Sequence, residues 1–401
     1  MVNWDLISII IFYSIILIFY FTHKNKFIVQ AKIFALYKTK LGLKTMEKIA
    51  NAFPRFLKYL SYTGIGVGFM GMVFMLYILV KETLALIFIP GTQPAIAPVL
   101  PGIDIPGAPA LSFWHWVIAI FITAVIHEFS HGVIAKLHKV KVKSSGFAFM
   151  GPILAAFVEP NEKTLAKKTP AQQLSIFAAG PFSNILLGIL ILLFSLFIFS
   201  PLVSDIYDGQ GITVNELMED YPVYELDVET PFTITEINGE ETLDALSFSE
   251  VVLTLKPGEE VTFTTDQGDI LVTPAEHPEN SSIAFFGISG LEQEQELKEN
   301  YSYLAPFENT ISWFALLLLW LFIINIGIGL FNLLPLGPVD GGRMLYTASL
   351  FFFKDEIKAK KLLTIVSFFV LAIIIINMIP WLSKFFVWIW SISTLILALF
   401  I

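Results

Sequence analysis

The chain has 401 residues, of which 55% are hydrophobic, and its mean hydropathy is +0.72. These values exclude an ordinary soluble globular protein and predict a membrane protein. The chain contains no cysteine, which excludes disulfides and thiolate metal ligands, so any metal must be bound by histidine, carboxylate or backbone groups.

The net charge of −9 is distributed unevenly along the chain. Residues 201–310 contain 24 acidic residues and two lysines, a net charge of −22, whereas the 23 basic and 10 acidic residues elsewhere sum to +13. This contrast predicts one acidic, water-soluble insert in a membrane protein. The basic residues flank apolar segments, which indicates a role in membrane topology and no binding of nucleic acid.

Seven apolar segments predict a polytopic α-helical membrane protein with six or seven transmembrane helices. Six of them are long enough to span or nearly span a bilayer, and they occupy residues 6–22, 60–80, 113–136, 177–199, 311–334 and 362–380. The seventh, Phe385–Ile401, is shorter and rich in tryptophan, so it is expected either to cross the bilayer or to lie at its interface. The first segment lacks preceding basic residues and a small-residue cleavage site, so we expect a retained anchor.

Clusters of basic residues predict the orientation of these helices. The segment Lys24–Lys58 contains nine basic residues and one acidic residue, so this loop is expected in the cytoplasm and the N-terminus outside. Counting helices forward places the lysines of 136–143, 163–168 and 354–361 on the cytoplasmic side and the acidic insert outside. The proline-rich connection 81–112 is expected to be an extracytoplasmic loop, either lying against the membrane or serving as a simple linker.

A His-Glu-x-x-His motif lies inside the third apolar segment. On a helix, His127 and His131 share one face, where two imidazoles can bind one zinc ion. Glu128 lies beside them, where it can take a proton from a water on the metal. Ionisable groups are costly at membrane depth, so the motif predicts hydrolysis of peptide bonds within a bilayer, near the cytoplasmic end of this helix.

A catalytic zinc normally has three protein ligands and one open position. The best candidate for the third ligand is Asp340, which follows the apolar segment 311–334 and a set of prolines that can turn the chain back toward the metal. A site with glutamate as its third ligand is the nearest enzymatic alternative, and Glu159 or Glu162 would then be the ligand.

The stretch Ser144–Pro160 is apolar and has Gly151-Pro152 at its centre, which predicts two short strands, Phe147–Met150 and Leu154–Val158. A transmembrane substrate must unwind locally, and its freed backbone groups then need partners where there is no water. We expect this hairpin to supply them by strand addition, with Phe147 and Phe149 in contact with substrate. A simple cytoplasmic loop is the alternative.

The acidic insert predicts a small mixed β/α fold. Its expected strands are Gly211–Val214, Thr233–Ile237, Glu260–Thr264 and Ile270–Val272, and its expected helix is Ser247–Leu255. Asn238-Gly239 and Asp266-Gln267-Gly268 supply the chemistry of tight turns.

These motifs together resemble the site-2 protease family of intramembrane zinc metalloproteases. The similar parts are the motif of His127–His131, the helix opening Gly180–Asn184, the segment Asn332-x-x-Pro335, and Asp340-Gly341, in this order. The resemblance covers roughly residues 113–345. The insert is similar to a PDZ domain at the turns Ile237–Gly239 and Lys256–Glu259, although Tyr221–Pro231 lacks the glycine-aspartate turn often seen there.

The resemblance implies that His127, His131 and Asp340 bind one catalytic zinc ion. Glu128 would be the general base and then the proton donor to the leaving amine. Asn184 and Asn332 would hydrogen-bond the substrate backbone, or else serve as polar contacts between helices.

The chain is thus expected to be an intramembrane zinc endopeptidase that cleaves membrane proteins in or near their transmembrane helices. The alternative hypotheses are a catalytically inactive zinc-binding scaffold and an ion transporter. A scaffold has no need of Glu128, and a transporter predicts inverted repeats that the sequence lacks. The expected divisions are N-terminal membrane helices and loop (1–112), catalytic membrane core (113–200 and 311–350), extracytoplasmic PDZ-like domain (201–310) and C-terminal membrane helices (351–401).

Overall fold

The computed structural model describes residues 4–30, 34–89, 92–103, 105, 108–150, 153–219, 221–226, 228–277 and 280–398. The chain divides into two compact units. The first, which we call the membrane unit, comprises Met1–Leu193 and Trp313–Ile401, and the second, the inserted unit, comprises Phe194–Ser312.

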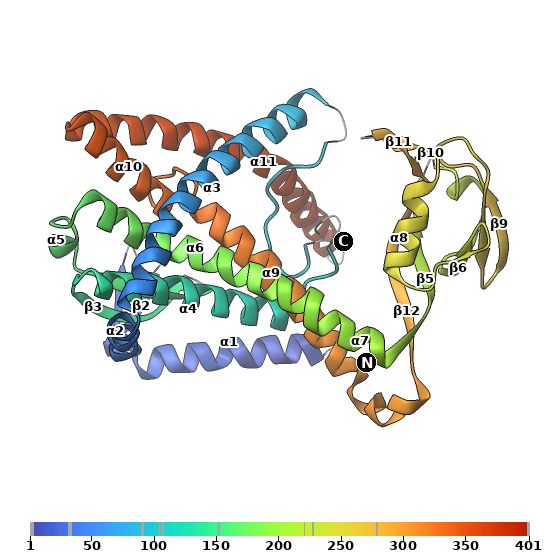
Figure 1. The fold of residues 1–401 in the computed structure, drawn as a ribbon, viewed down its shortest axis with the longest axis horizontal. Coiled ribbons are helices and arrows are strands. Elements are labelled where there is room, and N and C mark those ends of the chain that lie inside the picture. The colour runs from blue at the N-terminus through green and yellow to red at the C-terminus, as the bar shows by residue number, and fades with distance from the viewer. Residues whose placement is uncertain are drawn as a thin grey trace. The chain divides into compact units, whose positions relative to one another are not determined.

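Helices dominate the membrane unit (Figure 1). They are α1 (Trp4–Thr22), η1 (Lys24–Lys26), α2 (Leu43–Ala52), α3 (Pro54–Phe88), α4 (Phe113–Leu137), α5 (Glu162–Leu165), α6 (Pro170–Phe194), α9 (Glu308–Asn332), α10 (Asp340–Phe353) and α11 (Glu356–Ala398). Among the described residues, five helical stretches are long and apolar enough to cross a membrane: Pro54–Phe88, Phe113–Leu137, Pro170–Ile206, Glu299–Asn332 and Glu356–Ser383.

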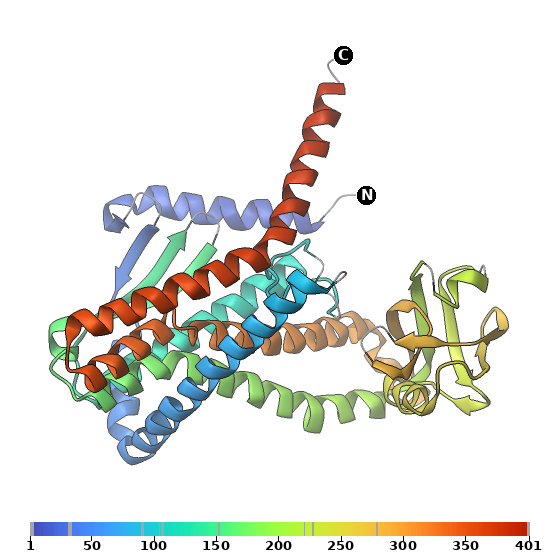
Figure 2. The ribbon, with the colours of Figure 1, turned by 90° about the horizontal axis from the view of Figure 1, so that it is seen from above.

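The two terminal apolar segments differ from these five. The first forms α1, whose apolar part Ile7–Thr22 is shorter than the other candidate spans. The last does not form a separate helix, because α11 continues without interruption from Glu356 to Ala398. Pro380 lies inside α11, and Figure 2 shows that this helix bends along its length, as expected where a proline removes a backbone hydrogen bond.

A four-stranded antiparallel sheet lies beside α1 in both views of the ribbon (Figures 1 and 2). Its strands, in sheet order, are β1 (Phe27–Gln30), β2 (Phe34–Thr39), β3 (Val142–Met150) and β4 (Ile153–Pro160). The predicted hairpin is therefore present as β3 and β4, which excludes the simple loop; its Gly151-Pro152 turn lies outside the described residues.

The N-terminal half of this sheet was not predicted. The segment that we expected to be a basic loop contributes β1 and β2, and β2 pairs with β3 along its full length. Edge-to-face contacts of Phe19 on α1 with Phe27 and Tyr37 hold the sheet against that helix, with ring centroids 5.9 and 5.3 Å apart. Strands β2 and β3 lie inside the sheet. In the described part of the chain, β1 and β4 are therefore its two edge strands.

The connection between α3 and α4 is tied to the surrounding helices. Asn377 of α11 accepts a hydrogen bond from the backbone N–H of Ala95 at 2.9 Å and donates to Thr83 of α3 at 2.6 Å. The indole N–H groups of Trp116 and Trp381 donate to carbonyls of the same connection, each at 2.9 Å. An irregular backbone between apolar helices needs such partners for its polar groups.

The inserted unit has the expected mixed β/α composition. Its main sheet has the order β12-β5-β6-β8-β9, with β7 paired to β6, and a separate hairpin joins β10 to β11. The elements are α7 (Ser200–Ile206, after the π-helical η2, Ser195–Phe199), β5 (Tyr207–Leu217), η3 (Tyr224–Leu226), β6 (Phe232–Ile237), β7 (Glu240–Glu241), α8 (Ala245–Thr254), β8 (Val261–Thr265), β9 (Gly268–Val272), β10 (Ala275–His277), β11 (Asn280–Phe285), β12 (Ile288–Leu297) and η4 (Glu299–Phe307).

The predicted strands of the insert lie within or overlap β5, β6, β8 and β9, and the predicted helix overlaps α8. Phe232, Ile234 and Phe263 are fully buried and form the centre of its core. Strand β12 was not predicted because its run of alternating Glu and Gln has no apolar face; its backbone pairs with β5 at the edge of the sheet. The likeness to a PDZ domain stays a prediction.

We expect Asn377→Ala to destabilise the membrane unit by about 1–2 kcal/mol, because the N–H of Ala95 loses its acceptor and α11 loses its buried polar contact with α3. The temperature of thermal unfolding in detergent measures this loss of stability. Ile375→Ala is the control, because Ile375 lies on the same helix but is about half exposed. Equal unfolding temperatures for the two variants would contradict the proposed anchoring.

Candidate metal centre

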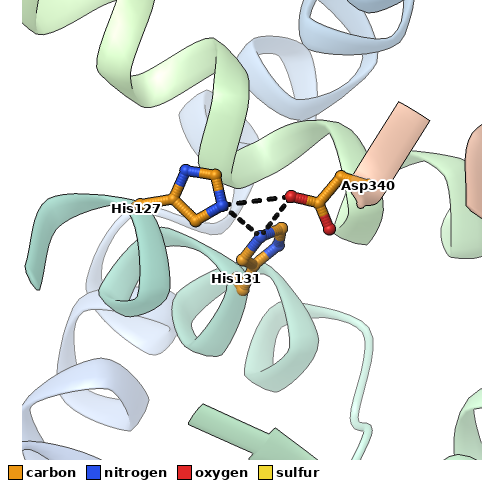
Figure 3. A group of neighbouring side chains, drawn as sticks. All are labelled: His127, His131 and Asp340. Atoms are coloured by element: carbon orange, nitrogen blue, oxygen red, sulfur yellow. Dashed lines mark hydrogen bonds and ion pairs between the residues drawn. The ribbon is translucent and has the colours of Figure 1, made fainter. Parts of the chain in front are cut away.

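Three side chains converge at one point in the membrane unit (Figure 3). His127 and His131 lie one turn apart on α4, and Asp340 is the first residue of α10. The Oδ2 atom of Asp340 is 3.0 Å from Nε2 of His127 and 3.1 Å from Nε2 of His131, and the two Nε2 atoms are 3.2 Å apart. Among the described residues, this is the one group of three or more potential ligands close enough to hold a metal ion.

The donor set fits zinc. Ligands at 2.0–2.1 Å from a tetrahedral zinc ion lie about 3.3 Å from one another, close to the separations found here. Both histidines are buried, and the exposed fractions of His127 and His131 are 7% and 8%. Two nitrogens and one carboxylate leave one tetrahedral position open.

A second set of contacts orients the imidazoles. Nδ1 of His131 lies 2.7 Å from the carbonyl oxygen of Ile176 on α6 and donates to it, which leaves Nε2 to face the other ligands. The side-chain amide nitrogen of fully buried Asn184 lies 3.0 Å from Nδ1 of His127, and the amide oxygen has no hydrogen-bond partner. With that oxygen turned toward Nδ1, the imidazole donates and its Nε2 lone pair is available for a metal.

Gly180 allows α6 to approach the two histidines. A Cβ atom at this position would lie 2.3 Å from Nε2 of His131 and 2.5 Å from Nε2 of His127, inside the space that the metal requires. The sequence motif pointed to this glycine, but only the packing of α6 on α4 explains it. Asn184, one turn further along α6, contacts His127 in the same interface and does not line the cavity beside the ligands.

Two glycines allow Asp340 to reach the site. Helix α9 ends at Asn332, and the chain makes a compact turn before α10 begins. A Cβ atom on Gly341 would lie 2.2 Å from the carbonyl oxygen of Leu333, and one on Gly342 would lie 2.1 Å from that of Leu336. Any larger residue would push α10, and with it the carboxylate, away from α4.

Glu128 connects the ligands to the sheet. Its Oε2 atom accepts a hydrogen bond of 2.8 Å from the backbone N–H of Val158 on β4. The carboxylate also lines a cavity of about 240 Å³ together with the three potential ligands and Asn332. Because the N–H of Val158 points to Glu128, the unpaired edge of β4 faces this cavity.

The two predicted aromatic contacts lie further away. Phe147 lines a neighbouring cavity, which also includes Glu128, and its ring lies 6.3 Å from that of Phe121. Phe149 packs edge-to-face against Phe27 of β1, with ring centroids 5.6 Å apart. Neither aromatic ring is in the wall of the cavity that holds the ligands.

The alternative ligands lie outside the site. Glu159 accepts hydrogen bonds from Lys38 at 2.6 Å and from Ser144 at 2.7 Å, and these contacts lower the pKa of Glu159 to about 2. Glu162 lies 3.9 Å from Arg343 at the start of α5. A third ligand from either glutamate is therefore not supported by this structure, whereas Asp340 is in place.

We expect Gly180→Ala to lose most of its zinc, because the new methyl group would occupy the space between the two Nε2 atoms. Zinc per polypeptide in the detergent-purified protein is the measurement. Gly327→Ala is the matched control, since a Cβ atom there meets nothing within 4 Å. If Gly180→Ala retains as much zinc as Gly327→Ala, the ion is not bound at this place.

Comparisons with known proteins identify the family of the chain. The model of peptidase family M50, the site-2 protease family, matches residues 115–376, which include all three potential ligands and Glu128. An uncharacterized protein of the archaeon Methanocaldococcus jannaschii is 31% identical over 329 residues, which is 77% of this chain and 76% of that protein. The chain belongs to peptidase family M50.

Proposed function

We propose that this protein is an intramembrane zinc endopeptidase that cleaves membrane proteins in or near their transmembrane helices. The observation that carries the proposal is the meeting of two imidazoles and one carboxylate, with Glu128 in the wall of the same cavity. A site that held zinc for structural reasons alone would not require a carboxylate in the wall of the cavity beside an open ligand position.

Each of these side chains has one role in the proposal. His127, His131 and Asp340 hold the zinc ion, and Asn184 and the carbonyl of Ile176 keep the imidazoles in the required orientation. When bound, zinc polarises the scissile carbonyl and lowers the pKa of water at the open position. Glu128 accepts the proton of the attacking water and passes it to the nitrogen of the leaving amine.

The edge of β4 is the proposed binding site for the substrate backbone. An unwound substrate segment pairs with this edge, which places its peptide bonds beside the cavity. Without substrate, the N–H of Val158 donates to Glu128. When a substrate strand pairs with β4, a substrate carbonyl replaces the carboxylate as the acceptor of this N–H. Asn332 lines the cavity, and its polar side chain is proposed to contact the substrate. Phe147 lines the neighbouring, mainly apolar cavity.

The distribution of charge supports a membrane orientation. The basic segments are proposed to face the cytoplasm, with the metal site near that side, and the acidic inserted unit and the N-terminus are proposed to lie outside. Substrates are then other proteins of the same bilayer, reached from within the membrane.

We expect Glu128→Gln to keep its zinc and lose cleavage by about 10²- to 10⁴-fold, because the amide cannot accept the proton. Cleavage of single-pass membrane proteins reconstituted with the enzyme is the assay. Glu47→Gln is the control, since Glu47 is an exposed carboxylate paired with Lys136 outside the site. Full activity in Glu128→Gln would exclude the assigned base, and a zinc-loaded wild type that cleaves no membrane protein would favour a scaffold.

The strand-addition step predicts a second effect. Ala156 lies two residues before Val158, so its N–H points to the same open edge of β4. Ala156→Pro removes this donor without breaking the bonds to β3 and is expected to reduce cleavage at least tenfold while zinc content stays unchanged. Ala156→Gly, which keeps the N–H, should remain active. Equal cleavage rates for the two variants would rule out strand addition at this edge.

A further inference from the structure

A second cavity adjoins the metal site. It has a volume of about 310 Å³ and shares three lining residues, Leu165, Phe177 and Arg343, with the cavity that holds the ligands. Arg343 is one of two arginines in the chain and lies in the first turn of α10, three residues after Asp340. It therefore brings a permanent positive charge to the junction of the two cavities.

The charge of Arg343 is held in place but weakly compensated. Its guanidinium lies over the ring of Phe177, 5.6 Å from the centroid. Its ion pair with Glu162 is long, at 3.9 Å, and the two side chains are 49% and 71% exposed. Exposed pairs of this kind contribute little, so the guanidinium can exchange this partner for another carboxylate.

The cavities on the two sides of the metal site differ in chemistry. On one side, a cavity of about 150 Å³ that shares Glu128 and Val158 with the metal site is lined mainly by apolar side chains, among them Leu41, Met46 and Phe147. On the other side, the walls of the cavity next to Arg343 are mixed: Leu165, Phe177 and Leu363 are apolar, and Glu162, Gln173, Tyr346 and Thr347 add polar side chains.

The order of these cavities follows the chain. Strand β4 leads from the apolar cavity past the metal site, and α5 follows it beside the cavity next to Arg343. A substrate strand paired with β4 would therefore run from apolar surroundings, through the site of cleavage, toward the guanidinium of Arg343 and the polar side chains near it. This matches a peptide that leaves a transmembrane helix and enters its polar flank.

We propose that Arg343 is a specificity residue that selects an acidic side chain on the polar flank of the scissile bond. The inference rests on the proposed function and names a feature of its substrates. A substrate carboxylate replaces Glu162 as the partner of the guanidinium, whereas a substrate lysine at the same place is repelled.

The test uses one single-pass membrane substrate that the wild type cleaves, with Asp, Asn or Lys placed in turn at each of the three positions on either side of the scissile bond. At one position on one flank, the wild type should prefer Asp over Lys in kcat/KM by about fivefold, the effect of a partly exposed ion pair. Arg343→Gln should remove the preference, and Arg343→Glu should reverse it. Arg55→Glu is the matched control, because Arg55 is exposed and lines neither cavity.

The outcomes separate this inference from the proposed function. A preference for Asp that persists unchanged in Arg343→Gln and Arg343→Glu, with cleavage and zinc content intact, would overturn the assignment and leave the protease in place. An equal loss of the preference in Arg55→Glu would also overturn it, because the effect would then come from overall charge. A zinc-loaded wild type that cleaves none of the single-pass membrane proteins from which this substrate is to be chosen would contradict the proposed function itself.

Discussion

The meeting of three ionisable side chains between apolar helices is the constraint on which the rest of the membrane unit depends. Such groups are costly in a bilayer unless each has a partner, and here the three potential ligands lie close enough together to share one metal ion. The approach requires close contacts of backbone as well. Because Gly180 has no side chain, α6 can lie close to the two imidazoles. Gly341 and Gly342 let the start of α10 pack closely against the backbone that follows α9.

Strand addition of a substrate, as proposed, would account for a sheet within a helical membrane protein. An unwound substrate exposes backbone groups that need partners away from water, and the open edge of β4 faces the cavity at Glu128. Strands β1 and β2 complete the other side of β3, so β4 is the edge left available beside α4. Glu128, the three potential ligands and the edge strand thereby line one cavity, although they come from separate parts of the chain.

Local patterns were sufficient to predict much of this arrangement. The histidine spacing on one helix and the prolines before Asp340 predicted the potential ligands, and Gly151-Pro152 predicted the hairpin. What depends on contacts between distant segments was not predicted. No periodic pattern in the sequence indicates the pairing of β2 with β3, the space that Gly180 leaves for the imidazoles, or the choice of His127 as the partner of Asn184. Strand β12 lacks an apolar face.

His127, His131 and Asp340 are proposed to hold one zinc ion, and this can be tested without a substrate by measuring zinc per polypeptide in the detergent-purified wild type and in Asp340→Ala. We expect about one zinc ion per chain in the wild type and a clear loss in the variant. Full retention of zinc by Asp340→Ala would remove Asp340 from the ligand set, and a wild type without zinc would contradict the metalloprotease reading as a whole.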